Sequence, residues 1–270
     1  MPFASVNGIE VYHEFHGADG PPVLKITGTG NDLRISRPKY SPFNDDFTVL
    51  HYDQRGLGQT SAPEGPYEMA DYAADAAAMI RWAGWEKCHV IGTSFGGMVA
   101  QHLAISYPEL VDRLVLHCTS PGGTKPSFPL HTIEVLDVES RLEMMLGLLD
   151  SRWNPAADDP IPDWPDGWYD AYIKHARVEP APAASAGRLR QLDARSRHDV
   201  ERRLRDVESP TLVCSGEWDD LAPVVNGMAL AEAIPDAEMR VFNAGHLLTI
   251  QDPTAVPITI DFLNGELTPE

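Results

Sequence analysis

Residues 92–96 read Gly-Thr-Ser-Phe-Gly, and no other segment of the chain points as directly to a chemical reaction. The apolar stretch 88–91 before them predicts a buried strand, and residues 98–107 after them predict a helix. A strand that enters a helix through Gly-x-Ser-x-Gly holds the serine in a cramped turn that exposes its hydroxyl. The flanking glycines avoid clashes where two backbones approach. Ser94 is therefore the candidate nucleophile, and a glycine-rich turn with a purely structural role is the alternative.

A serine hydroxyl becomes a good nucleophile only when a base takes its proton and an acid orients that base. This kind of turn requires the chain order serine, acid, histidine. Residues 211–214 predict a strand that ends at an acidic loop, and a strand predicted over 238–242 is followed by His246. Both loops follow the carboxyl ends of strands, as Ser94 does. We predict His246 as the base, because the other histidines lie in apolar runs, in a helix or away from such loops.

The acid has three candidates in one loop, namely Glu217, Asp219 and Asp220. We predict Asp219, because Gly216 releases the chain from the strand and Asp219 then projects from the loop. Asp220 is better explained as a solvated charge near the start of the next helix. The other common location for this acid, just after a strand predicted over 113–116, holds no carboxylate.

Acyl transfer also needs N–H donors aimed at the oxygen that becomes negative. The turn itself supplies the backbone N–H of Phe95. The second donor is expected from the glycine-rich loop after the strand predicted over 22–26, where Thr29 is the best candidate, although its side chain could instead hydrogen-bond locally. A phosphate-binding loop is the rival interpretation of residues 28–30, but no Gly-Lys-Ser/Thr follows them.

Apolar strands alternate with helical patterns along the chain, which predicts an α/β fold with a mainly parallel, doubly wound sheet. Residues 3–6 and 9–15 are the exception. They predict an antiparallel hairpin, because Asn7-Gly8 suits a two-residue turn. The sheet is therefore expected to be mixed.

The 270 residues suffice for one catalytic core with an insertion. We predict a core formed by residues 1–121 and 206–270, and a helical cap formed by residues 122–205. Such a cap would lie over Ser94 and exclude water from the substrate site. Four apolar side chains are candidates for the substrate pocket: Trp153, Trp168, Tyr172 and Leu247. Aromatic residues that form the cap's own core are the alternative. Helices are expected in this segment at 139–149, 168–178 and 183–196.

Together these motifs resemble those of the α/β-hydrolase fold superfamily, and the core resembles its serine esterase and 3-oxoadipate enol-lactonase branch. The matching segments are 28–34, 52–61, 92–97, 216–219 and 245–246. Two features depart from the family pattern. Many relatives carry His-Gly before the oxyanion donor, whereas this chain has Thr27-Gly28, and the segment between 122 and 205 matches no pattern we can name.

The resemblance implies hydrolysis of a small carboxylic ester or lactone through an acyl-serine intermediate, without a metal or other cofactor. A hydrolase of a carbon–carbon or amide bond on the same triad is one alternative. A small-ligand receptor derived from a hydrolase is another, and it would give at most a single stoichiometric burst with an activated ester.

The formal net charge of −19 argues against a nucleic-acid surface and against binding to an anionic membrane. No apolar run is long enough to span a bilayer, and the chain enters its first hairpin without a signal sequence, so a cytoplasmic protein is expected. The three cysteines adjoin apolar runs and are expected to be buried thiols. No Cys or His cluster has metal-ligand spacing. The oligomeric state stays open.

Overall fold

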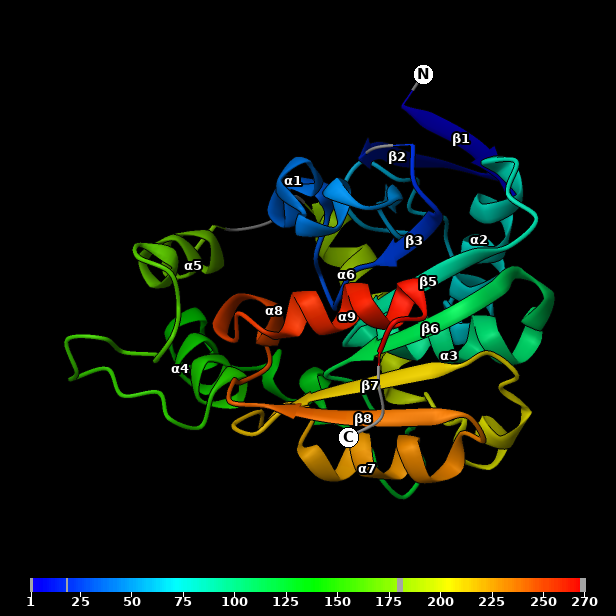
Figure 1. Cartoon of the computed structure of the whole chain (residues 1–270). Coiled ribbons are helices and arrows are strands. Elements are labelled where there is room, and N and C mark those ends of the chain that lie inside the picture. Colours follow the sequence, from blue (N-terminus) through cyan, green and yellow to red (C-terminus); the bar gives the residue numbers. More distant parts are fainter. Residues whose placement is uncertain (1, 18, 179–181, 268–270) are drawn as a thin grey trace.

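The computed structural model describes residues 2–17, 19–178 and 182–267. These residues form an eight-stranded sheet in the order β1-β2-β4-β3-β5-β6-β7-β8 (Figure 1). β2 pairs with β1 and β4 in antiparallel fashion, and all later pairs are parallel. The predicted mixed α/β sheet is confirmed. The strands are β1 (Phe3–Val6), β2 (Ile9–Gly17), β3 (Pro22–Ile26), β4 (Thr48–Tyr52), β5 (Cys88–Thr93), β6 (Val111–His117), β7 (Thr211–Gly216) and β8 (Ala237–Phe242).

The predicted N-terminal hairpin is formed by β1 and β2. Val6 pairs with Ile9, so Asn7 and Gly8 alone make the turn. Their φ angles are 50° and 76°. Positive φ at both central residues gives a turn whose twist matches that of the flanking strands, and asparagine and glycine tolerate it better than other residues.

Helices cover both faces of the sheet (Figure 1). Because side chains alternate along a strand, Leu24 packs into one apolar cluster, with residues of α2, α3 and α7, while Val23 packs into another, with residues of α8 and α9. No helix in the described part of the chain is long and apolar enough to cross a membrane. The helices are α1 (Leu33–Ser36), α2 (Met69–Trp82), α3 (Phe95–Ser106), α4 (Val138–Leu149), α5 (Trp168–Ala176), α6 (Pro182–Ser196), α7 (Val224–Ala233), α8 (Leu248–Gln251) and α9 (Ala255–Asn264). Short 3-10 helices lie at Pro38–Tyr40, Pro42–Asp45, Pro108–Leu110, Leu130–Ile133 and Glu201–Asp206.

The segment between β6 and β7 carries α4, α5 and α6, close to the three expected helical ranges. Its buried side chains, among them Leu146, Trp164 and Leu192, form an apolar cluster separate from the two that flank the sheet. The backbone N–H groups of Asp220 and Leu221 both donate to the carbonyl of Leu148, at 3.1 and 2.9 Å. The C-terminal end of α4 therefore lies against the loop that follows β7.

Candidate active site

Ser94 lies at the junction of β5 and α3 with φ 56° and ψ −117°. A positive φ is strained for serine and costs on the order of 1–3 kcal/mol. The flanking glycines allow the turn, because a Cβ on Gly92 would lie 2.5 Å from the carbonyl oxygen of Gly96, and one on Gly96 would lie 2.2 Å from that of Ile26. The turn is held from β6, since Ser94 N–H donates to the carbonyl of His117 at 2.8 Å. The strained turn expected between the strand and the helix is present, although Ser94 itself is only 6% exposed.

Asp219 and His246 are brought together from the loops after β7 and β8. His246 Nδ1 lies 2.7 Å from Asp219 Oδ2. The other carboxylate oxygen, Oδ1, accepts the backbone N–H groups of Leu221 at 2.9 Å and Ala222 at 2.8 Å. Asp219 is 2% exposed and His246 is 6% exposed. Since Oδ2 is an acceptor, the proton between the pair belongs to His246 Nδ1, which leaves Nε2 free to accept another proton.

The other two acid candidates, Glu217 and Asp220, both lie exposed at the surface. Neither contacts His246. Asp219 is buried while Glu217 and Asp220 are exposed, because the loop after Gly216 turns tightly, with Asp219 N–H donating to the Gly216 carbonyl at 3.3 Å. The geometry therefore favours Asp219 as the residue that orients the imidazole.

Ser94 and His246 form no hydrogen bond in the described part of the chain, although both are buried and lie at the same edge of the sheet. Cys118 lies between the turn that carries Ser94 and the loop that carries His246. It follows His117, the acceptor of the Ser94 N–H, and its Sγ lies 4.0 Å from the carbonyl oxygen of Gly245, beside His246. Catalytic hydrogen bonds are often long without substrate and shorten when it binds.

Cys118 occupies the second common acid position noted in the sequence, and sequence reasoning did not place it in the site. Ligand atoms of Cys118, Asp219 and His246 all lie within 4.8 Å of one another, a spacing that could hold a metal ion. Burial and the nearby Asp219 carboxylate raise the pKa of the Cys118 thiol well above its ordinary value. The contacts present are those of a hydrogen-bonded pair, because Asp219 Oδ2 lies 2.7 Å from His246 Nδ1 and Oδ1 accepts two backbone N–H groups.

The loop expected to supply the second oxyanion donor lies beside Ser94. A Cβ on Gly28 would be 3.4 Å from Ser94 Cβ. Thr29 Oγ1 is buried and has no hydrogen-bond partner in the described residues, so the alternative of a local side-chain bond at Thr29 is not observed. The N–H of Gly30 is already used, because it donates to Oε1 of Gln191 on α6 at 2.8 Å.

Thr27 stands where many relatives have histidine, and the loop is held here by other contacts. Gln54 Nε2 donates to the Thr27 carbonyl at 2.9 Å. Asp53, next to Gln54, accepts the backbone N–H of Leu33 at 2.7 Å and that of Gln59 at 2.8 Å. Burial raises the pKa of Asp53 to about 6. These contacts fix the backbone on both sides of Thr29.

The four predicted pocket residues divide into two groups. Trp153, Tyr172 and Leu247 pack against the apolar cluster of α4 to α6. Trp168 is 46% exposed, at the start of α5, and the structure does not bring it into that cluster. The alternative interpretation, that these aromatic residues form the hydrophobic core of the cap, requires the same packing. The contacts of Trp153, Tyr172 and Leu247 are therefore compatible with both interpretations.

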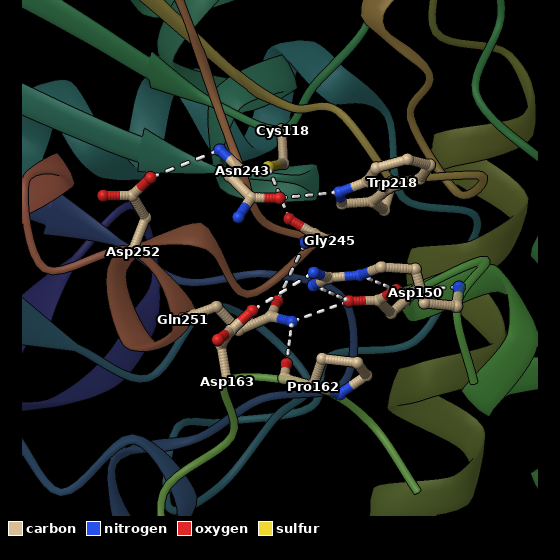
Figure 2. Close-up of polar contacts among 10 residues, drawn as sticks. Cys118, Asp150, Pro162, Asp163, Trp218, Asn243, Gly245, Gln251 and Asp252 are labelled. Atoms are coloured by element: carbon tan, nitrogen blue, oxygen red, sulfur yellow. Dashed lines mark hydrogen bonds and ion pairs between the residues drawn. The ribbon is translucent and has the colours of Figure 1, made fainter. Parts of the chain in front are cut away.

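Figure 2 shows a polar network that ties the His246 loop to the end of α4. Gln251 Oε1 accepts the N–H of Gly245 at 3.0 Å, and Gln251 Nε2 donates to Oδ2 of Asp150 at 2.7 Å. Asp150 is fully buried and pairs with Arg152, whose Nη2 lies 2.7 Å from the same oxygen. The His246 N–H itself donates to the carbonyl of Leu149. No local sequence pattern predicts the contacts between Gln251 and Asp150 or between His246 and Leu149, because these residues lie about a hundred positions apart.

The family assignment agrees with this geometry. The family model for the alpha/beta hydrolase fold matches residues 21–150, which include Ser94 and the loop at Thr29. The chain has the α/β-hydrolase fold. Among proteins of this fold, the chain resembles the enol-lactonase branch, as expected from the motifs.

Relatives match over nearly the whole chain. A poly(3-hydroxyalkanoate) depolymerase of Ectopseudomonas oleovorans is 29% identical over 91% of this chain and 85% of its own length. The 3-oxoadipate enol-lactonase 2 of Acinetobacter baylyi is 25% identical over 90% of this chain and 88% of its own. The crystal structure of the enol-lactonase from Burkholderia xenovorans LB400 superposes with a TM-score of 0.80, at 24% identity, over 98% of this chain and all of that one. These matches support hydrolase activity for this chain.

Proposed function

We propose that the protein hydrolyses small carboxylic esters or lactones through an acyl-serine intermediate. Ser94 is the nucleophile, His246 the general base and acid, and Asp219 the residue that orients His246. The observation that carries the proposal is the buried 2.7 Å contact between His246 Nδ1 and Asp219 Oδ2, at the sheet edge where Ser94 lies in its strained turn. The names of the depolymerase and enol-lactonase relatives support an ester or lactone as the bond that is cleaved.

In the first half of the reaction, His246 Nε2 accepts the proton of Ser94 as its oxygen attacks the acyl carbonyl. The imidazolium that forms is stabilised by the Asp219 carboxylate, whose other oxygen stays fixed by two backbone N–H groups. The carbonyl oxygen becomes negative and is held by the N–H groups of Phe95 and Thr29. Phe95 is the first residue of α3, so its N–H has no carbonyl partner within the helix. No carbonyl among the described residues accepts the N–H of Thr29. Both donors are therefore available. His246 then returns its proton to the leaving alcohol.

In the second half, water replaces the alcohol. His246 takes a proton from water, the resulting hydroxide attacks the acyl carbon, and the ester bond to Ser94 breaks as His246 protonates its oxygen. A lactone substrate differs only in that the leaving alcohol remains attached to the product acid. No step uses a metal or another cofactor.

We further propose that residues 122–205 form a cap over the site, on a core formed by residues 1–121 and 206–270. Gln191 of α6 reaches the Thr29 loop, and Leu148 and Leu149 of α4 bind the loops of Asp219 and His246. The segment thus touches both the oxyanion side and the acid–base side of the proposed site. Trp153, Tyr172 and Leu247 are the proposed apolar lining, and Trp168 would contribute only if α5 moved inward.

The proposal is tested with a substrate panel of p-nitrophenyl esters of increasing acyl length, aliphatic lactones of several ring sizes, and an anilide. Multiple turnover of an ester or lactone is expected, with a cutoff in kcat/KM as the acyl group exceeds the space below the cap. Turnover of the anilide alone would move the assignment to amide bonds. A single burst equal to the protein concentration, with no further turnover, would indicate a receptor.

A further inference from the structure

Arg195, in the last turn of α6, is a buried cation with an incomplete set of partners. Its side chain is almost fully enclosed, and the residue is 6% exposed. Nη1 donates to the carbonyl of Phe128 at 2.8 Å and Nη2 to Oγ of Ser127 at 2.7 Å. Its Nε is buried and has no hydrogen-bond partner among the described residues. Both partners are neutral oxygens, so the positive charge is not neutralised by them.

Two neighbouring arginines pair with carboxylates: Arg188 of α6 pairs with Glu134, and Arg197, just after the end of α6, pairs with Asp193. Arg190 of α6 donates to the carbonyl of Pro63. No carboxylate pairs with Arg195 in the described part of the chain, although Arg195 is the most buried of these four arginines. Burial lowers the pKa of Arg195 to about 10, which still leaves it charged at neutral pH. A buried charge without a counter-charge is costly, and buried unsatisfied groups in folded proteins commonly mark a missing ion or ligand.

A cavity of about 70 Å³ has Arg195 among its lining residues. Ser120, Ser127 and His198 are among its lining residues, and the lining contains no Asp or Glu. His198 is neutral at pH 7, because burial lowers its pKa to about 4, and its Nε2 lies 2.9 Å from the carbonyl of Ser120. His131 also lines the cavity and is exposed, so the cavity reaches solvent. The space exceeds that of one water molecule.

We propose that this cavity binds a small carboxylate, of the size of formate or acetate, as the counter-ion of Arg195. A planar guanidinium matches a carboxylate well, and charge-assisted bonds of this kind are the strong ones. None of Ser94, Asp219 and His246 lines the cavity, so this is a second site. Met98, one turn along α3 from Ser94, does line it. The inference does not depend on the proposed hydrolase function.

The test compares sodium acetate with sodium chloride at equal ionic strength and pH 7.5, using the melting temperature of the full chain. At ten times the dissociation constant, acetate should raise the melting temperature by about 2–3 °C more than chloride does. Arg195→Gln should lose this difference, and Arg195→Lys should keep part of it. Arg197→Gln, at an exposed position just after the end of the same helix, should behave like the unaltered protein.

Equilibrium dialysis of radiolabelled acetate against the unaltered protein gives an answer even where Arg195→Gln does not fold. One acetate bound per chain is expected, displaced by formate and not by chloride. Equal effects of acetate and chloride on melting, an undiminished acetate effect in folded Arg195→Gln, or no bound acetate in dialysis would each overturn the proposal.

Discussion

Replacing Asp219 by asparagine should cost far more activity than the loss of one charge alone would suggest. Oδ1 of Asp219 accepts two buried N–H groups, those of Leu221 and Ala222. An asparagine has a single side-chain oxygen, which must occupy the Oδ1 position to accept both of these N–H groups. The amide NH₂ then takes the place of Oδ2, which accepts a hydrogen bond from His246 Nδ1 in the native protein. The NH₂ of the asparagine and the Nδ1–H of His246 are both donors, so they cannot hydrogen-bond to each other.

The imidazole can satisfy this donor only by moving its proton from Nδ1 to Nε2. Nε2 is the nitrogen that must accept the Ser94 proton, so the base is blocked. The same exchange in a serine protease triad lowers kcat about 10⁴-fold. We expect a comparable loss for Asp219→Asn, which corresponds to about 5 kcal/mol of transition-state stabilisation. Folding should be preserved, because the shape and the two N–H bonds are retained.

The assay is kcat and kcat/KM for the best ester of the substrate panel, with circular dichroism and melting temperature as folding controls. Asp220→Asn is the matched control, because Asp220 is exposed and donates only its backbone N–H to Leu148. It should stay within about twofold of the unaltered protein. If Asp219→Asn retains more than a tenth of the native kcat, or if Asp220→Asn is the more damaging change, the assignment of the acid is wrong.

The value of kcat/KM should rise from acidic pH to a plateau, because only an unprotonated His246 accepts the Ser94 proton. EDTA should leave kcat/KM unchanged. Activity that is lost in EDTA and restored by a divalent ion would contradict the mechanism. Asp150→Ala should lower the free energy of unfolding by about 1–3 kcal/mol. The change removes a buried partner of Arg152 and of Gln251, while Arg152 keeps Asp163 and Gln251 keeps the carbonyl of Pro162. It should also lower kcat. Chemical denaturation and kinetics measure the two effects, and a native kcat would show that the network does not position His246. Burial lowers the pKa of His198 to about 4, below its value in the unfolded chain. The contribution of His198 to the free energy of unfolding is therefore present above about pH 6.5 and is lost as the pH falls toward 4, at up to about 1.4 kcal/mol per pH unit. His198→Asn should flatten the acid side of the curve of stability against pH, and an unchanged slope would contradict this.

The sequence predicted the elements that position the site, because these depend on local signals. Apolar runs bounded by glycine predicted β5 and β7 within two residues of their observed ends. The Asn7-Gly8 pair predicted the hairpin, because few other residue pairs adopt positive φ at two successive positions. Ser94 followed from the same kind of evidence, since the glycines on either side are required by a local backbone contact.

The contacts that surround His246 could not be predicted in this way. Gln251 and Asp150 are polar residues that look like surface positions in the sequence, and only the packing of α4 against the β8 loop buries them together. The position of Cys118 beside Gly245 likewise depends on the order of β6, β7 and β8 in the sheet. The exposure of Trp168 was missed because an aromatic residue in a helical pattern predicts burial, whereas α5 has no fully buried residue.

Stoichiometric labelling with a fluorophosphonate, followed by intact-mass measurement and peptide mapping, tests whether Ser94 is an activated nucleophile. We expect one phosphonyl group per chain, located on Ser94, with loss of ester turnover in proportion to labelling. Ser94→Ala should take up no label and lose about 10⁴-fold or more in kcat while melting normally. Labelling of another residue together with turnover that survives in Ser94→Ala would show that Ser94 is not the nucleophile.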